Sequence, residues 1–201
     1  MTYFGQAAAS FALMVLMLGF SLWGFRNKKF FLQSILHPAS VVNERQFYRF
    51  FTSDLVHNDW IHLLLNEFMM YICCVNLEIY LSNASGHGHW YFLLIFLASN
   101  VSGALYVTVR HSRDFEYAVA GASGSIMGCM FSYMMLQPHI IAFYLPVVGG
   151  VENIFAGLIY ILLLIRLQFK NKSAYSHELH FFGALGGILS TLALFPNILR
   201  F

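Results

Sequence analysis

The sequence predicts an all-α membrane protein with six membrane-spanning helices, and its composition and the length of its apolar runs carry that prediction. Of the 201 residues, 59% are hydrophobic and only 10% are charged. One soluble core could not hide that much apolar surface, whereas a bilayer solvates each apolar run of about 20 residues as a helix. The net charge of +2 is too small to indicate a nucleic-acid partner. We therefore expect a multi-pass integral membrane protein in contact with the lipid bilayer, binding no nucleic acid.

Six segments of the chain are the expected spans. They are residues 7–25, 60–81, 90–109, 123–137, 140–167 and 179–194. The first run has no basic stretch before it and no small-residue cleavage site after it, so we expect an uncleaved helix rather than a signal peptide. Pro146, Gly149 and Gly150 interrupt the fifth segment. Its first part is therefore expected to be a loop or a loose helix.

The long first loop, residues 30–59, mixes aromatic and aliphatic side chains with charged ones. Amphipathic pieces that lie partly in the membrane surface explain this mixture better than a spanning helix does. His37 and Pro38 break any continuous helix in this loop, because proline excludes the helical conformation of the residue before it. We expect a partly membrane-embedded first loop.

The second span and the turn after it contain several polar residues. His62 and Asn66 are four residues apart and share one helix face, at a depth where polar side chains need partners. A lone intramembrane histidine is often a packing residue, but a histidine–asparagine pair favours a shared polar site. Glu78 lies near the end of the span and is expected to reach the interface. His87 and His89, in the turn that follows, are expected to be solvated.

The helix that begins at Ser123 has the features of a nucleophile site. Its N-terminal backbone N–H groups and its dipole favour negative charge that develops beside Ser123. Gly124, Gly128 and Ser132 recur every four residues and form a smooth stripe on which another helix can pack closely. The hydrolase motif G-x-S-x-G is not matched, because Ser125 stands where its second glycine should be. The serine therefore needs partners from elsewhere in the chain.

The sixth span supplies a partner. His180, Gly183 and Gly187 lie at helical spacing, so one face carries a histidine and two glycines. Packing of this face on the Ser123 helix would bring His180 beside Ser123. Imidazole can take the proton of a serine hydroxyl, which is otherwise a poor nucleophile. No aspartate is placed to orient the histidine, so we expect a Ser–His dyad.

Three motifs together resemble those of the rhomboid family of intramembrane serine proteases. Residues 57–66 read H-N-D-W-I-H-L-L-L-N, similar to the second-helix pattern of two histidines and an asparagine. Residues 121–124 read G-A-S-G and match the family's G-x-S-G. Residues 180–187 match its last-helix motif H-x-x-G-x-x-x-G. Each motif alone is weak, but three in order on the expected helices are specific.

The resemblance covers nearly the whole chain and implies a single rhomboid-like transmembrane domain over residues 1–201. It implies a serine endopeptidase that cleaves transmembrane segments of membrane proteins with a Ser123–His180 dyad and without a cofactor or metal. His62 and Asn66 would help to form the oxyanion site. Residues expected to pack around the site are Gly121, Gly124, Gly128, Gly183, Gly187 and Met127.

Two positions depart from the family's pattern. The Trp-Arg pair of the first loop reads Tyr48-Arg49, which keeps an aromatic beside a cation. The family often has an aromatic residue under the catalytic imidazole four residues after the serine, and Met127 takes that place. A thioether can contact an aromatic ring, but it would hold His180 less firmly, which affects the rate rather than the chemistry.

Other interpretations stay open beside this one. Residues 177–180 read H-E-L-H, but the zinc motif H-E-x-x-H needs histidines four residues apart, not three. A catalytically inactive rhomboid-like protein that binds or escorts membrane clients typically lacks the serine or the histidine, and both are present here. A transporter or structural bundle explains the apolar content but not the three motifs.

The charges conflict with the orientation that the resemblance implies. The loops after the first, third and fifth spans hold nearly all cations: Arg26, Lys28, Lys29, Arg45, Arg49, Arg110, Arg113, Arg166, Lys170 and Lys172. The positive-inside rule would place these loops in the cytoplasm. The resemblance implies a cytoplasmic N-terminus, an active site that opens outward and, as the expected location, a bacterial plasma membrane. We follow the resemblance, because an embedded first loop can anchor its cations at lipid headgroups. The substrate sequence and the oligomeric state are not indicated.

Overall fold

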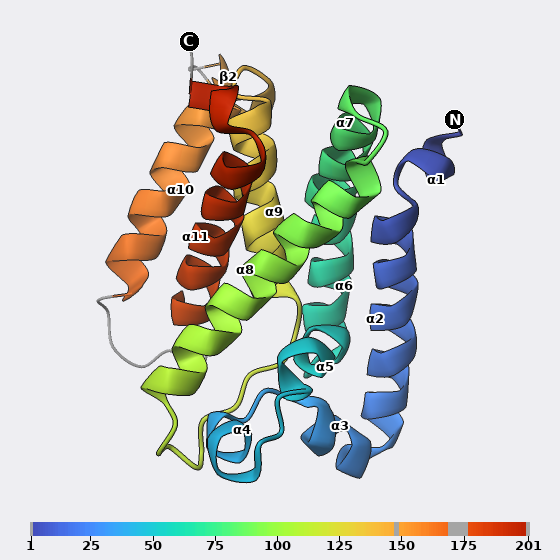
Figure 1. The fold of residues 1–201 in the computed structure, drawn as a ribbon, viewed down its shortest axis with the longest axis vertical. Helices are drawn as coiled ribbons and strands as arrows, with labels where there is room; N and C mark the ends of the chain where they lie inside the picture. The colour runs from blue at the N-terminus through green and yellow to red at the C-terminus, as the bar shows by residue number, and fades with distance from the viewer. Residues whose placement is uncertain (1, 147–148, 169–176, 200–201) are drawn as a thin grey trace.

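A computed structural model describes residues 2–146, 149–168 and 177–199, which fold as a bundle of helices (Figure 1). The elements in chain order are α1 (Tyr3–Gln6), α2 (Ala8–Arg26), α3 (Lys28–Ser34), α4 (Pro38–Glu44), α5 (Arg49–Leu55), α6 (Trp60–Met69), the π-helical turn η1 (Met70–Val75), α7 (Asn76–Ala84), α8 (Gly88–Arg110), α9 (Ser123–Leu136), β1 (Ile141–Leu145), β2 (Gly149–Glu152), α10 (Asn153–Gln168), α11 (His177–Leu194) and the 3-10 turn η2 (Pro196–Leu199). The prediction of a mainly helical chain is confirmed.

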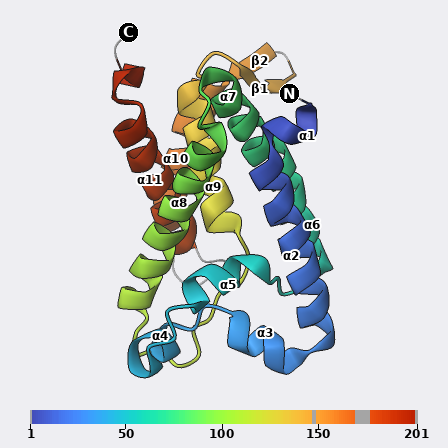
Figure 2. The same ribbon diagram turned by 45° about the vertical axis from the view of Figure 1, so that its right-hand side comes forward.

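Three helices of the described chain are long and apolar enough to cross a membrane. They are α2, the continuous helix 60–84 formed by α6, η1 and α7, and α8. The other three predicted spans correspond to the shorter helices α9, α10 and α11. Helices α9 and α11 pack against α8, and α10 packs against α9 and α11 (Figure 2). Their crossing of the bilayer, and so the count of six spans, stays a prediction.

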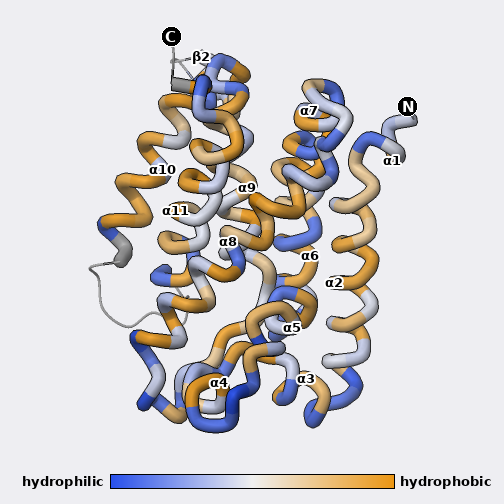
Figure 3. The backbone as a smooth tube through the Cα atoms, viewed as in Figure 1, coloured by the Kyte–Doolittle hydropathy of each residue, from blue (hydrophilic) through white to orange (hydrophobic). Residues whose placement is uncertain are grey.

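The outer surface of the bundle is apolar where a bilayer would cover it. Hydrophobic residues line the helices along their length, and hydrophilic residues gather in the turns and in the short helices at their ends (Figure 3). The large exposed side chains of α6 and α10 include Ile61, Leu64, Phe155 and Leu162, each more than half exposed. Such a continuous apolar surface indicates contact with lipid rather than with water.

The first loop forms three short helices, α3, α4 and α5, at the end of the bundle where α6 and α9 begin (Figure 1). His37 and Pro38 do break the helix, as expected, and they also start the next one. The His37 side chain caps the N-terminus of α4, and Pro38 occupies its first turn, where a missing N–H costs nothing. The depth of this loop in the membrane stays a prediction.

The core of the bundle is the contact of α8, α9 and α11, and glycines make it close. A Cβ atom added at Gly183 would overlap the carbonyl group of Gly124, and one at Gly187 would overlap that of Gly128. Backbone therefore touches backbone along the stripe that the sequence predicted. Beyond the glycines, the Ser132 and Thr191 hydroxyls hydrogen-bond each other.

The start of the fifth predicted span is a β-hairpin, so the expectation of a loop or a loose helix was wrong there. β1 and β2 pair antiparallel, with Leu145 opposite Gly149. Gly149 has a φ of +92°, a conformation that glycine reaches without steric cost. The aliphatic and aromatic residues of β1 favour a strand, and α10 begins only at Asn153. The polar residues 171–176 that follow the span lie outside the described residues.

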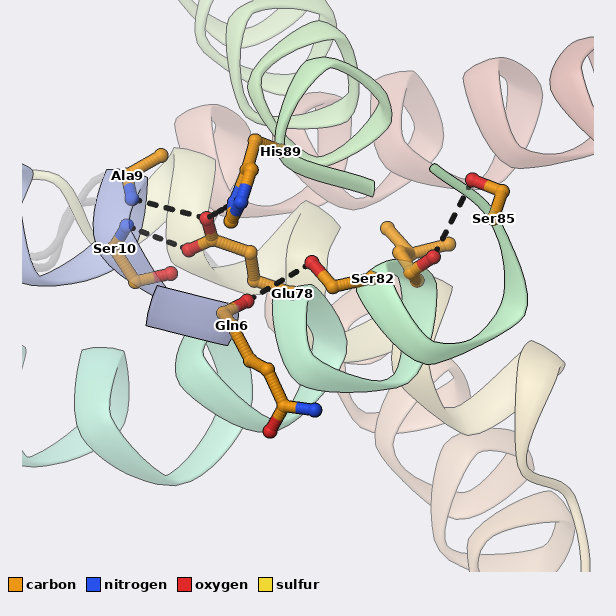
Figure 4. A network of polar contacts seen from close by, with 8 residues as sticks. Gln6, Ala9, Ser10, Glu78, Ser82, Ser85 and His89 are labelled. Atoms are coloured by element: carbon orange, nitrogen blue, oxygen red, sulfur yellow. Dashed lines mark hydrogen bonds and ion pairs between the residues drawn. The ribbon is translucent and has the colours of Figure 1, made fainter. Parts of the chain in front are cut away.

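Glu78 lies at the centre of a network of polar contacts between helix ends (Figure 4). Its side chain is fully buried, and its carboxylate accepts hydrogen bonds from the backbone N–H groups of Ala9 (3.0 Å) and Ser10 (2.7 Å). His89 Nδ1 lies 2.5 Å from the same carboxylate. Glu78 is therefore buried between helix ends, and His89 pairs with it while its side chain stays 35% exposed, whereas His87 is exposed as expected. The free N–H groups at the start of α2 attract the anion, and the network ties α2, α7 and α8 together.

Candidate active site

Ser123 and His180 meet where the N-terminus of α9 lies against α11. The Ser123 Oγ atom lies 2.7 Å from His180 Nε2, although the residues are 57 positions apart in the sequence. The glycine contacts between the two helices make this approach possible, since any larger side chain at Gly183 would separate their backbones. In the described part of the chain, no carboxylate hydrogen-bonds His180. A base and a hydroxyl are thus in hydrogen-bonding contact.

The turn before the serine is held by a close contact with His62 and by hydrogen bonds to the first loop. Gly121 has a φ of +100°, and a Cβ atom there would lie 2.6 Å from Cε1 of His62. Only glycine satisfies both conditions. The Gly121 N–H donates to the Ser53 carbonyl at 2.8 Å, and Leu36 and Val119 exchange backbone hydrogen bonds of 2.9 and 3.0 Å. The first loop therefore holds the chain that leads into Ser123.

His62 and Asn66 lie on the face of α6 that approaches this turn. His62 contacts the Gly121 backbone closely, while Asp59 caps α6 by accepting the His62 N–H at 2.8 Å. Asn66 is 4% exposed, and one N–H of its amide donates to the His62 carbonyl at 2.9 Å. Its Oδ1 atom has no partner among the described residues. The second N–H of the amide is left to donate to another group, because an amide NH₂ carries two hydrogens.

His57 is a neighbour of the site for which the sequence predicts no role of its own. It is fully buried, its Nδ1 lies 2.9 Å from the Ser21 hydroxyl, and its ring meets that of His62 edge-on at 5.1 Å between centroids. Burial, with a smaller effect of His62, lowers the pKa of His57 to about 3. The ring is therefore neutral and packs against the His62 ring. Its place in the motif could have drawn attention to it, but only the fold shows what it touches.

The Tyr48-Arg49 pair closes the first loop on itself. The Arg49 guanidinium is buried and donates to the carbonyl oxygens of Leu32 (2.9 Å) and Ile35 (2.7 Å). Its Cζ atom lies 5.6 Å from the centre of the Tyr48 ring, within cation–π range. The Tyr48–Arg49 pair therefore stabilises the fold of the first loop.

Met127 lies one turn beyond the serine, in an apolar cluster with Phe181 and Ala184. The histidines 177 and 180, which suggested a zinc motif, do not form a metal site in the described part of the chain, where no three His, Cys, Asp or Glu side chains converge. His180 instead faces Ser123.

The sequence over residues 44–197, more than half of the chain, matches the family described as Rhomboid domain. The chain belongs to the rhomboid family. No curated protein matches it. Rhomboid membership, together with the apolar helices, makes the chain an integral membrane protein and implies a function of the intramembrane-protease type. The rhomboid match includes α6, α9 and α11, the three helices on which the site is built.

Proposed function

We propose that this rhomboid protein is an intramembrane serine endopeptidase that cleaves transmembrane segments of membrane proteins with a dyad of Ser123 and His180. The observation that carries the proposal is the 2.7 Å contact of Ser123 Oγ with His180 Nε2 at the start of α9. The helix N-terminus adds free N–H groups where an oxyanion would form.

The proposed reaction passes through an acyl-enzyme. His180 Nε2 takes the proton of Ser123 as its Oγ atom attacks the scissile carbonyl carbon. The oxyanion accepts hydrogen bonds from the Ser123 N–H, the free N–H of Asn66 and the His62 ring. The C–N bond then breaks, and His180 gives its proton to the leaving amine. Water attacks the ester, His180 takes the water's proton, and the C–Oγ bond breaks as Ser123 regains a proton.

The substrate must be a membrane segment that unwinds. In a helix each carbonyl accepts an intrahelical hydrogen bond and is shielded by its neighbours. The enzyme itself would be a single six-span domain over residues 1–201, with a partly embedded first loop and a cytoplasmic N-terminus, in a bacterial plasma membrane. The proposed chemistry needs no cofactor, only a water path to Ser123 from one membrane face.

Labelling by a fluorophosphonate probe tests the proposal, because the probe reacts only with an activated serine. The wild-type protein should be labelled, whereas Ser123→Ala and His180→Ala should not. Ser132→Ala, which removes another buried hydroxyl of α9, is the matched control and should be labelled like the wild type. Equal labelling of Ser123→Ala would exclude this nucleophile, and an unlabelled wild type that still binds membrane proteins would identify an inactive escort.

A further inference from the structure

A second polar cluster lies behind the serine, on the side of the first loop. It is formed by Asp54 of α5, Asn100 of α8 and Ser125 of α9, which are 8%, 6% and 1% exposed. The Ser125 hydroxyl donates to Asp54 Oδ2 at 2.5 Å. Asn100 donates to the Phe50 carbonyl of α5 at 2.9 Å, and its side chain lies near enough to the Asp54 carboxyl to lower the pKa of that group. Three separate elements therefore converge on one buried carboxyl group.

This cluster is directly connected to the nucleophile. Ser125 lies two residues after Ser123, within the first turn of α9. On the other side of the serine, the Gly121 N–H donates to the carbonyl of Ser53, the neighbour of Asp54. The end of α5 thus holds the chain both before and after Ser123. A helical turn is stiff, so two fixed points so close together determine where the Ser123 Oγ atom lies.

Packing alone does not account for a carboxyl group at this place. Burial raises the pKa of Asp54 to about 7, against the opposing effect of the hydrogen bonds from Ser125 and Asn100. Among the described residues, no Lys, Arg or His nitrogen forms an ion pair with it. Arg49, on the same helix, directs its guanidinium to the carbonyls of the first loop. An apolar side chain would fill the space without this desolvation cost.

We propose, on the basis of the proposed function, that Asp54 is a positioning residue for the nucleophile. Its carboxyl group holds the first turn of α9 through the Ser125 hydroxyl, while the Ser53 carbonyl holds Gly121. Together they keep Ser123 Oγ in line with His180. Asp54 does not contact the substrate, and its effect on the reaction passes through the geometry of α9.

This role predicts a pattern among four variants. Asp54→Ala and Ser125→Ala each break the same hydrogen bond, so each should lower kcat roughly 10-fold or more with little change in KM. The double variant should be no slower than the slower single one, because the two residues act through one contact. Asp54→Asn should recover most of the rate, since its amide oxygen still accepts the Ser125 hydroxyl.

The experiment measures kcat and KM per folded molecule in detergent on a transmembrane substrate. Ser132→Ala is the control: its hydroxyl is equally buried on α9 and bonds Thr191, so its loss should lower thermal stability and leave kcat unchanged. Wild-type kcat in Ser125→Ala, or an equal loss of kcat in Ser132→Ala, would overturn the positioning role. If Asp54→Ala does not fold, Ser125→Ala and Asp54→Asn decide the question.

Ser123→Ala belongs in the same series to keep two failures apart. Full cleavage by Ser123→Ala would contradict the proposed function itself. Loss of cleavage in Ser123→Ala together with wild-type kcat in the Asp54 and Ser125 variants would contradict only the positioning role.

Discussion

Asn66 is the residue at which a structural role and a chemical role predict different results. As a packing residue, its replacement would lower stability and leave turnover per folded molecule unchanged. As an oxyanion donor through its free N–H, it would stabilise charge only in the transition state. Asn66→Ala should then fold and lose about 10²- to 10³-fold in kcat with little change in KM. Kinetics on the folded fraction check this, and wild-type kcat would leave Asn66 a structural role alone.

Asp54 predicts how stability depends on pH. Its pKa is raised from the ordinary 3.8 to about 7 in the folded protein, so between these values the folded state keeps a proton that the unfolded chain has released. The stabilising contribution is present below pH 3.8 and is lost as the pH rises through about 7, by up to about 1.4 kcal/mol per pH unit. Asp54→Asn lacks this titration. Thermal unfolding in detergent should show the wild type losing stability relative to Asp54→Asn from pH 5 to pH 8, and a constant difference would contradict the raised pKa.

At the residue scale, the sequence could indicate the reacting pair but not its support. Ser123 and His180 were predictable because helical spacing places glycines on the same faces as these residues, and the glycines bring the faces together. The contacts of Asp54 and His57 were not, because the path of an irregular loop sets them. No period along the chain records such contacts.

At the scale of elements, the regular helices were predictable and the irregular ones were not. The apolar runs predicted the positions of α2, α8 and α11 to within a few residues, because lipid selects for length and hydrophobicity. The hairpin of β1 and β2 was missed, since a short apolar run cannot be assigned by period alone. The capping of α2 by Glu78 was missed as well, because it joins helix ends that are distant in sequence.

We expect the substrate to enter the active site between α6 and α10. The gate is expected at the fifth predicted span and the loop after it. In the structure this span is not one continuous helix, because the hairpin of β1 and β2 precedes α10. Phe155 of α10 is 57% exposed. A crosslink between cysteines placed at Phe155 and at Met69 of α6 should block cleavage of membrane substrates, because it would tie α10 to α6 and close the path between them. Uncrosslinked protein with the same two cysteines is the control, and full activity of the verified crosslinked form would place the entrance elsewhere.

For the whole molecule, the orientation in the membrane is the point on which charge and family disagree. We expect a cytoplasmic Met1 and an outward loop at residues 171–172, which lies outside the described residues. Reporter fusions at both positions test this expectation. Not every cation of the first loop argues against an outward loop, since Arg49 is buried and donates to carbonyl groups of its own loop. A cytoplasmic reporter at residue 171 would show that the positive-inside rule prevails.

The central claim is that Ser123 and His180 act as one catalytic unit, and the most direct measurement is the kcat of the two single alanine variants and of the double variant. Removal of either residue should abolish turnover, and the double variant should be little worse than a single one, because coupled catalytic groups lose their effect together. Purified Ser123→Ala that cleaves a transmembrane substrate at nearly the wild-type rate would contradict the account.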